Sequence, residues 1–311
     1  MRNKIITSVF CMLLAVGVLS EIFVPDKYYS ESEKRTLTQK SAVSISDFWS
    51  GKMGTQVEKY LADQIPLRDC WITVKTVAER LGGKTETAGV YFGKDGYLID
   101  SFTSYSKKQF YSNVSALVKL SNILDNAGIP MQVMLVPTAA YVYEDDLPSN
   151  AMRFDEDKAF TDAEKALGDS LIDLRTNLRE KVMRVRIDSA DKTGEMMTVG
   201  HDVFFKTDHH WSGYGAFLGC NAFLSASGLS ESVRTYEEEN PVVLSDSFYG
   251  TLYSKVLLDT LSADTIETPS AALNRSCKVK FSGKTYDSLY FKEYLEKKDK
   301  YAVYFGGNYD K

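Results

Sequence analysis

The chain has 311 residues, of which 44% are hydrophobic and 12% aromatic, and it carries a net charge of −5 at pH 7. This length and composition suffice for one large folded domain or for one and a half. No run of lysine and arginine stands out, so the basic footprint of a nucleic-acid-binding protein is missing, and nucleic acid is not expected as a partner.

The N-terminal residues 1–24 set the expected compartment. Arg2 and Lys4 form a short basic lead, and an almost entirely apolar stretch follows to Val24. Its length suits either the core of a signal peptide or a marginal membrane span. No clean cleavage site follows it, which favours an uncleaved signal anchor over a cleaved export signal. In both cases the rest of the chain is expected to work outside the cytoplasm, anchored to the membrane or secreted.

A linker is expected at 25–50, followed by a single domain over 51–311. Apolar spacing predicts two helices between 48 and 81, broken at Pro66. A β-hairpin is predicted at 89–99. The next predicted helix covers 106–127, where Gly128 ends it.

The following segments alternate between strand and helix. The apolar run at 131–138, polar where it exits, is typical of a central strand in a parallel sheet. The elements predicted after it are a helix near 155–167, a strand at 171–174, a helix near 175–183, a strand at 203–205 and a helix at 212–226. This order predicts an α/β fold with a doubly wound parallel sheet and helices on both faces. The apolar stripe of the last helix, which includes Cys220, is expected to face the core.

The sequence pattern changes after Gly228. Residues 229–292 have the pattern of irregular strands and loops, and we interpret them as a β-rich insertion that covers a site. The segment 301–305 is then expected to be another core strand. Cys70, Cys220 and Cys277 show no framework spacing, so no disulfide is predicted.

The pentapeptide at 207–211 contains two of the three histidines of the chain. In an extended segment, residues two apart project to the same side. Asp208 can then accept a hydrogen bond from Nδ1 of His210, which leaves Nε2 free to take a proton from a nucleophile. Imidazole titrates near neutrality, so this pairing favours a general base. The adjacent Ser212 is a suitable N-cap for the predicted helix.

Other interpretations of the pentapeptide stay open. His209 and His210 can be ordinary polar turn residues. Asp208 and the two histidines can also bind a metal, but no other histidine or cysteine lies at ligand spacing, so no metal or cofactor is expected. Trp211 is expected to be a packing wall behind the imidazole of His210.

Seven segments, in this order, carry a resemblance to the DHHW family of exported bacterial proteins, which is related to the alginate O-acetyltransferases with SGNH-hydrolase-like domains. The resemblance covers the chain from about residue 26 to its end. The segments are SESEKR at 30–35, YLADQIPLRD at 60–69, GVY at 89–91, LVPT at 135–138, FKTDHHWS at 205–212, FYGTLY at 248–253 and GGN at 306–308.

The resemblance implies an SGNH-hydrolase-like fold and serine-type acyl transfer. In such relatives the Asp-x-His element supplies two members of a Ser-His-Asp triad, here Asp208 and His210. The implied function is an extracytoplasmic O-acetyltransferase or acetylesterase acting on cell-surface polysaccharide, beside a membrane-bound O-acyltransferase as acyl donor. The alternative is a non-catalytic glycan-binding or scaffold subunit of a cell-envelope assembly.

The nucleophile is where the chain departs from the family pattern. Relatives carry their serine in a Gly-Asp-Ser-Phe or Lys-Asp-Ser-Tyr type of segment, just after a strand like 301–305. The chain ends at Lys311, before any such segment, so we expect a sequence truncated at its C-terminus. Ser247 lies in an Asp-Ser-Phe sequence, but no helix signal follows that would supply backbone donors for an oxyanion.

Overall fold

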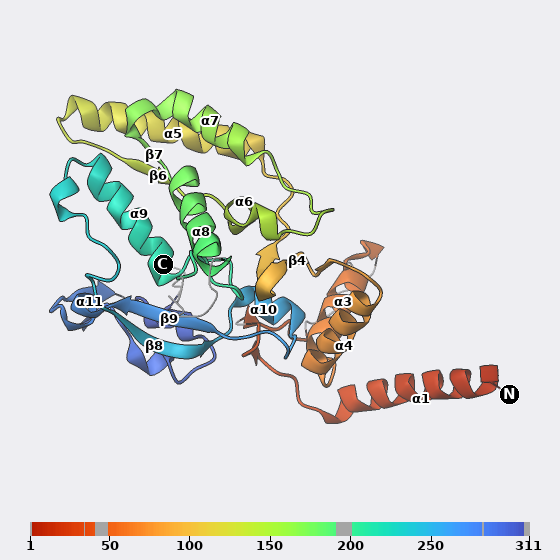
Figure 1. The fold of residues 1–311 in the computed structure, drawn as a ribbon. Coiled ribbons are helices and arrows are strands. Elements are labelled where there is room, and N and C mark those ends of the chain that lie inside the picture. The colour runs from red at the N-terminus through yellow and green to blue at the C-terminus, as the bar shows by residue number, and fades with distance from the viewer. Residues whose placement is uncertain (1, 34, 41–48, 191–200, 282, 308–311) are drawn as a thin grey trace. The chain divides into compact units, whose positions relative to one another are not determined.

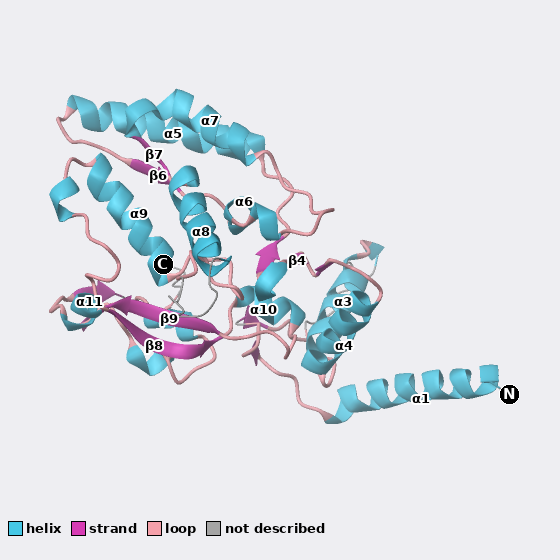
Figure 2. Cartoon of the chain, viewed as in Figure 1, coloured by secondary structure: helices cyan, strands magenta, loops and turns pink. Residues whose placement is uncertain are grey.

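The structure, a computed structural model, describes residues 2–33, 35–40, 49–190, 201–281 and 283–307. The chain divides into two compact units. The first comprises Met1–Gly83 with Ser254–Leu258, and the second Lys84–Tyr253 with Asp259–Lys311. More of the described residues lie in helices than in the short strands (Figure 2). The helices predicted between 48 and 81 belong to the first unit.

The first unit contains α1 (Arg2–Phe23), a two-stranded antiparallel sheet and a helix pair. The strands are β1 (Tyr29–Ser30) and β2 (Arg35–Thr36), and the helices are α3 (Lys52–Gln64) and α4 (Arg68–Leu81). The predicted break between the helices is confirmed. Pro66 disfavours helix in the residue before it, and Leu67 has a φ of 57°, in the left-handed region.

No helix within the described residues is long and apolar enough to cross a membrane. The apolar N-terminal segment forms α1, and its role as a signal anchor or signal peptide stays a prediction of the sequence.

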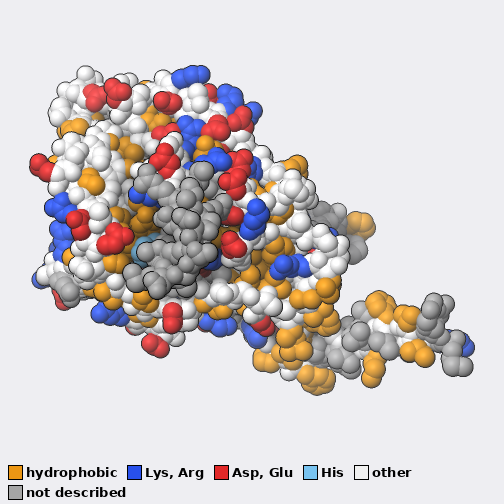
Figure 3. Space-filling view, in the orientation of Figure 1, with side chains coloured by type: hydrophobic (Ala, Val, Ile, Leu, Met, Phe, Trp, Pro, Cys, Tyr) orange, Lys and Arg blue, Asp and Glu red, His pale blue; other side chains and the backbone are white. Residues whose placement is uncertain are grey.

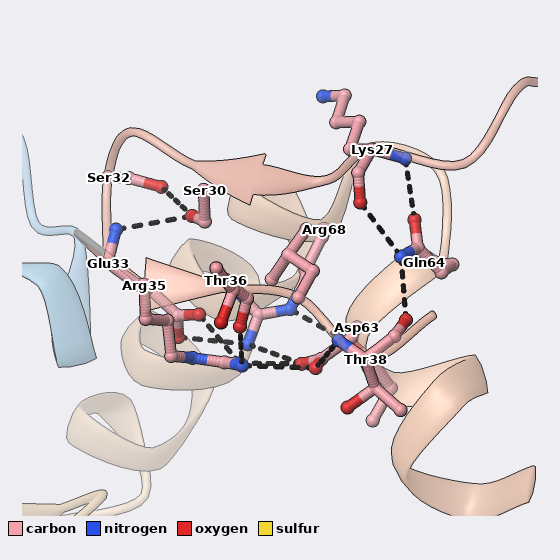
Figure 4. Close-up of polar contacts among 12 residues, drawn as sticks. Lys27, Ser30, Ser32, Glu33, Arg35, Thr36, Thr38, Asp63, Gln64 and Arg68 are labelled. Atoms are coloured by element: carbon pink, nitrogen blue, oxygen red, sulfur yellow. Dashed lines mark hydrogen bonds and ion pairs between the residues drawn. The ribbon is translucent and has the colours of Figure 1, made fainter. Parts of the chain in front are cut away.

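A buried carboxylate joins two of the segments that carry the family resemblance (Figure 4). Asp63, on α3, is 8% exposed and accepts two hydrogen bonds from Arg35, at 2.5 and 3.0 Å. It also accepts the backbone N–H of Thr38 at 2.8 Å. The hydrogen bond from Arg35 holds the pKa of Asp63 well below its usual range. Nearby, Arg68 bonds Glu33 at 2.9 Å.

The second unit begins with a three-stranded antiparallel sheet made of β3 (Glu86–Thr87), β4 (Val90–Phe92) and β5 (Leu98–Asp100). A 3₁₀ turn at Lys94–Gly96 connects the last two strands, so the predicted hairpin is confirmed. Val90 and Ile99 are fully buried and anchor this sheet.

A parallel strand pair forms the centre of the second unit. β6 (Val133–Leu135) pairs with β7 (Leu171–Asp173), with Val133 opposite Leu171. The helices α5 (Lys107–Asn126) and α7 (Glu156–Leu167) lie on one side of the pair, and α8 (Arg175–Ala190) and α9 (Gly213–Ala226) lie on the other (Figure 1). Both α7 and α9 contact β7. The α/β class with helices on both faces is therefore confirmed.

The buried face of α9 differs from the prediction. Gly215, Leu218 and Gly219 are its buried residues, whereas Cys220 is exposed and Phe223 is 43% exposed. Close neighbours occupy the glycine face, because a Cβ on Gly215 would lie 2.2 Å from the carbonyl oxygen of Val203. The helix therefore approaches the core through its small residues. All four cysteines are free.

Two predicted strands are not strands in the structure. Residues 203–205 are buried as expected, but only Phe204 forms a bridge, to Trp211, because the chain turns back at once. Residues 301–305 were expected in the core sheet. Instead Lys300–Val303 is a 3₁₀ helix, and Phe305 has a φ of 60°, which an extended strand does not adopt.

The region after Gly228 is rich in short strands. β8 (Pro241–Phe248) and β9 (Asp264–Pro269) form an irregular antiparallel ribbon. The other α-helices and strands of the described chain are α6 (Ala139–Val142), α10 (Thr251–Val256), α11 (Ser270–Asn274), β10 (Val279–Phe281) and β11 (Lys284–Tyr286). In Figure 3, acidic and basic side chains are interspersed over the visible face of the second unit.

Candidate active site

The pentapeptide lies in a tight loop of the chain. Phe204 and Trp211 face each other in an antiparallel bridge, and the backbone N–H of Ser212 donates to the carbonyl of Val203 at 2.9 Å. The Ser212 hydroxyl accepts the N–H of Gly215 at 3.1 Å and caps α9, as predicted. Residues 206–210 therefore form the tip of a loop that two buried segments hold at its base.

The Asp208 carboxylate is enclosed, at 2% exposure, and both of its oxygens accept hydrogen bonds. Oδ1 accepts from the backbone N–H of His210 at 3.0 Å and from its Nδ1 at 2.5 Å. Oδ2 accepts from the backbone N–H of Thr251 at 2.6 Å and from its hydroxyl at 3.0 Å. A carboxylate offers about four lone-pair sites, so four donors satisfy Asp208 as a hydrogen-bond acceptor.

These contacts explain the charge state of Asp208. Burial by itself opposes ionisation, but the hydrogen bonds from His210 and Thr251 outweigh it and hold the pKa of Asp208 well below its usual range. The residue is therefore a carboxylate at neutral pH, and the Nδ1 atom that faces it carries the proton.

The pairing of Asp208 with His210 does not arise as the sequence pattern suggested. Residues 206–210 bend instead of running extended. The carboxylate folds back onto the N–H two residues ahead, which is the geometry of an Asx turn. The two side chains meet because of this local hydrogen bond, and not because of strand alternation.

Gly250 is a residue of the site that the sequence did not single out. A Cβ at this position would lie 2.2 Å from Cβ of Asp208 and 2.4 Å from its Oδ2. No side chain fits that space. The segment 248–253, which carries part of the family resemblance, therefore includes a glycine that lets the backbone approach the carboxylate.

Tyr301 lies against the imidazole of His210, with ring centroids 4.5 Å apart and planes 14° apart. Burial raises the pKa of Tyr301, so its phenol stays neutral. The His210 side chain is 35% exposed, and within the described ranges its Nε2 has no hydrogen-bond partner. No local pattern predicted the role of Tyr301, because only tertiary packing brings it to the motif.

His209 and Trp211 have different surroundings. The His209 side chain is 46% exposed, and its Nδ1 lies 2.7 Å from the hydroxyl of Thr251. Trp211 packs on α9, where a Cβ on Gly219 would lie 3.0 Å from its ring. Trp211 is thus a packing residue, but Tyr301 and not Trp211 stacks on the imidazole of His210.

A metal ion was one alternative for this cluster. One ligand atom each from Asp208, His209 and His210 lie within 4.8 Å of one another. However, the carboxylate oxygens already accept four hydrogen bonds, and Nδ1 of His210 donates one of them. Coordination through these atoms would displace existing bonds, so the arrangement fits a hydrogen-bonded pair better than a metal site.

Ser247, the serine that the sequence offered as a possible nucleophile, is exposed on β8. Its hydroxyl lies 3.2 Å from that of Ser245. The expectation that no helix follows it was wrong, because α10 begins at Thr251. Within the described residues, no serine hydroxyl is hydrogen-bonded to His210.

A second histidine–carboxylate pair lies elsewhere in the unit. Nδ1 of His201 is 2.9 Å from Oε1 of Glu267, on β9. The His201 ring packs against Tyr214 and Tyr236, at 5.3 and 4.6 Å between centroids. The same two tyrosines line a cavity of about 710 Å³ between α8, α9 and residues 233–237. None of the three polar residues at 208–210 lines this cavity.

The parallel strand pair between two helix layers, with a carboxylate–imidazole pair in the loop before α9, agrees with the SGNH hydrolase-like class to which the family match assigns the chain. Residues 90–265, more than half of the chain, match the family described as the SGNH hydrolase-like domain of acetyltransferase AlgX, and the chain belongs to this family. The predicted family relation is thereby confirmed.

Solved structures with the same fold include PatB1 of Bacillus cereus, with a TM-score of 0.52 at 19% identity over 71% of this chain and 73% of that one. A DHHW family protein from Eubacterium siraeum gives 0.46 at 17% identity, over 72% and 69% of the two chains. The O-acetyltransferase domain of Pseudomonas putida AlgJ gives 0.43 at 18% identity and covers 58% of this chain. That match spans 63% of the AlgJ domain, less than two thirds. Among curated proteins, none matches significantly.

Proposed function

We propose that the protein is an extracytoplasmic O-acetyltransferase or acetylesterase that acts on cell-surface polysaccharide through a serine. The observation that carries the proposal is the 2.5 Å hydrogen bond between Nδ1 of His210 and the buried Asp208 carboxylate. This contact orients the ring so that Nε2, the atom a general base uses, is the one left available.

In the proposed reaction, Nε2 of His210 takes the proton of a serine hydroxyl while the serine oxygen attacks the acetyl carbonyl. The tetrahedral intermediate then expels the original alcohol, and the imidazolium returns the proton to it. A sugar hydroxyl or water next attacks the acetyl-enzyme while His210 removes its proton. The second tetrahedral intermediate then expels the serine oxygen, which takes the proton back from His210. Asp208 stays ionised throughout and stabilises the imidazolium.

Family membership supports acetyl as the transferred group, since the matching family is described as an acetyltransferase. The polysaccharide acceptor and a membrane-bound O-acyltransferase as acetyl donor are proposals that come from the resemblance. The extracytoplasmic location is proposed from the basic and apolar N-terminal sequence at 1–24.

The proposed nucleophile is a serine, and its position can be mapped directly. A sulfonyl fluoride forms a covalent bond to an activated serine oxygen and releases fluoride. Peptide mass spectrometry of the labelled protein then identifies the residue. Ser247 is the candidate within the described ranges, and Ser245, its neighbour on β8, is the matched comparison.

The decisive experiment measures acetyl release from p-nitrophenyl acetate and from an acetylated polysaccharide. We expect His210→Ala to lower kcat by at least about 10³-fold, because the serine then has no base. His201→Ala, which removes the histidine paired with Glu267, is the matched control and should keep the parent rate. Equal rates for the parent and His210→Ala would refute the mechanism.

A second candidate function is glycan binding without catalysis, as a subunit of a cell-envelope assembly. One observation favours it: within the described residues, no serine hydroxyl is hydrogen-bonded to His210. If this function is correct, the parent protein and the His210→Ala variant bind polysaccharide with the same affinity. Acetyl release then stays at the uncatalysed rate in both proteins.

A further inference from the structure

A second carboxylate holds the loop from which Asp208 projects. Asp264, the first residue of β9, is 5% exposed. Its Oδ1 accepts the backbone N–H of Lys206 at 2.7 Å, and its Oδ2 accepts that of Thr207 at 2.8 Å. The Thr207 hydroxyl also donates to Oδ2. One buried side chain therefore binds both residues that immediately precede Asp208.

Thr207 extends this connection to the opposite side of the site. The residue is fully buried, and its hydroxyl accepts the backbone N–H of Gly250 at 3.0 Å while it donates to Asp264. The Thr207 carbonyl accepts two further backbone N–H groups, at 3.1 and 3.0 Å, from residues 252–253. Thr207 therefore binds the residues on both sides of Thr251, the residue that donates to Asp208.

The contacts form a connected frame around the carboxylate. On one side, Asp264 fixes the backbone before Asp208. On the other side, Thr207 fixes the segment 250–253, whose backbone approaches Asp208 closely enough to exclude a Cβ at Gly250. The orientation of Asp208 thus depends on hydrogen bonds that it does not itself make.

We propose that Asp264 and Thr207 are positioning residues, which hold the Asp208 carboxylate where it orients His210. The inference rests on the proposed role of the Asp208–His210 pair. Neither residue contacts His210 by a hydrogen bond, so both act through the backbone on the two sides of Asp208. An asparagine at 264 cannot replace the carboxylate, since its NH₂ group would face N–H and O–H donors.

Asp264→Asn and Thr207→Val test the proposal, and Thr207→Ser is the conservative variant that keeps the hydroxyl. The first readout is the downfield proton NMR resonance of the His210 Nδ1–H, which requires the bond to Asp208. We expect both disruptive variants to shift or broaden it and to lower kcat at least about tenfold while KM changes less than about twofold. Thr207→Ser should keep the parent resonance and the parent kcat. Asp287→Asn, at an exposed position after β11, should change neither.

A folded Asp264→Asn or Thr207→Val protein with the parent resonance and the parent kcat would overturn the proposal. If Asp264→Asn does not fold, Thr207→Val decides alone, because it leaves both backbone bonds to Asp264 in place. The NMR resonance requires no turnover. A protein without acetyl-ester activity would therefore contradict the proposed function, while the resonance still decides whether Asp264 and Thr207 position Asp208.

Discussion

Among the described residues, His210 and His201 are each hydrogen-bonded to a carboxylate, and the two pairs differ in how the carboxylate is held. In the Asp208–His210 pair, the carboxylate is 2% exposed and accepts four hydrogen bonds. In the His201–Glu267 pair, the Glu267 side chain is 15% exposed, and its contact with His201 is 2.9 Å against 2.5 Å in the first pair.

The imidazoles also differ in their surroundings. His210 stacks face to face on Tyr301 and is 35% exposed, whereas His201 packs among Tyr214 and Tyr236 and is 25% exposed. A hydrogen bond between histidine and carboxylate is therefore not sufficient to indicate a catalytic base. What distinguishes the first pair is a carboxylate fixed by three further hydrogen bonds, next to a more exposed ring that stacks on Tyr301.

The strongest test of this comparison exchanges each carboxylate for its amide. We expect Asp208→Asn to lower the rate of acetyl release by about 10³–10⁴-fold, because the amide presents a donor to the imidazole and favours the wrong tautomer. Glu267→Gln should leave the rate within about threefold of the parent. Kinetics on p-nitrophenyl acetate measure both, and a similar loss in the two variants would show that the pairs are not functionally distinct.

A second test uses the glycines beside each pair. A Cβ on Gly250 would lie 2.2 Å from Cβ of Asp208, and a Cβ on Gly213 would lie 2.5 Å from the carbonyl oxygen of Glu267. We expect either alanine variant to lower the free energy of unfolding by about 2–4 kcal/mol. Only Gly250→Ala should also reduce kcat, by about 10²-fold, because it displaces the carboxylate. Denaturant unfolding and kinetics on the same proteins separate the two effects.

Asp264 and His201 should each change the stability of the protein, but over different pH ranges. Burial raises the pKa of Asp264 to about 6 from an ordinary value of 3.8. Because the folded state holds this proton more tightly, stability falls as pH rises from about 4 to 6, by roughly 3 kcal/mol. The hydrogen bond to Glu267 raises the pKa of His201. The stabilisation from this hydrogen bond is complete below the unfolded-state pKa of His201 and is lost as pH rises through the folded-state pKa.

Unfolding by denaturant from pH 4 to pH 8 measures both contributions. Asp264→Asn should remove the decrease in the free energy of unfolding at acidic pH and leave the decrease near neutrality. His201→Gln should remove the decrease near neutrality and leave the one at acidic pH. If neither variant changes the curve in its own range, these two groups do not control the pH dependence of stability.

Much of the fold could be predicted from the sequence because it is encoded locally. Pro66 between two amphipathic segments marked the break between α3 and α4, and Ser212 marked the start of α9. The parallel pair β6–β7 was evident from apolar runs between helical segments. The strand predicted at 301–305 was wrong because apolar content alone does not specify extended backbone, and Phe305 adopts a positive φ.

The sequence by itself determined the family, the α/β class and the proximity of Asp208 to His210, because each depends on residues close together in the chain. Only the tertiary structure decided which groups surround that pair. Thr251, Gly250, Asp264 and Tyr301 come from three separate segments, and packing of Phe205 with Phe248, Ile266 and Val303 brings those segments to the motif. The local turn supplies the donors of His210, and only this packing adds the two donors of Thr251 that complete the hydrogen bonds of the Asp208 carboxylate.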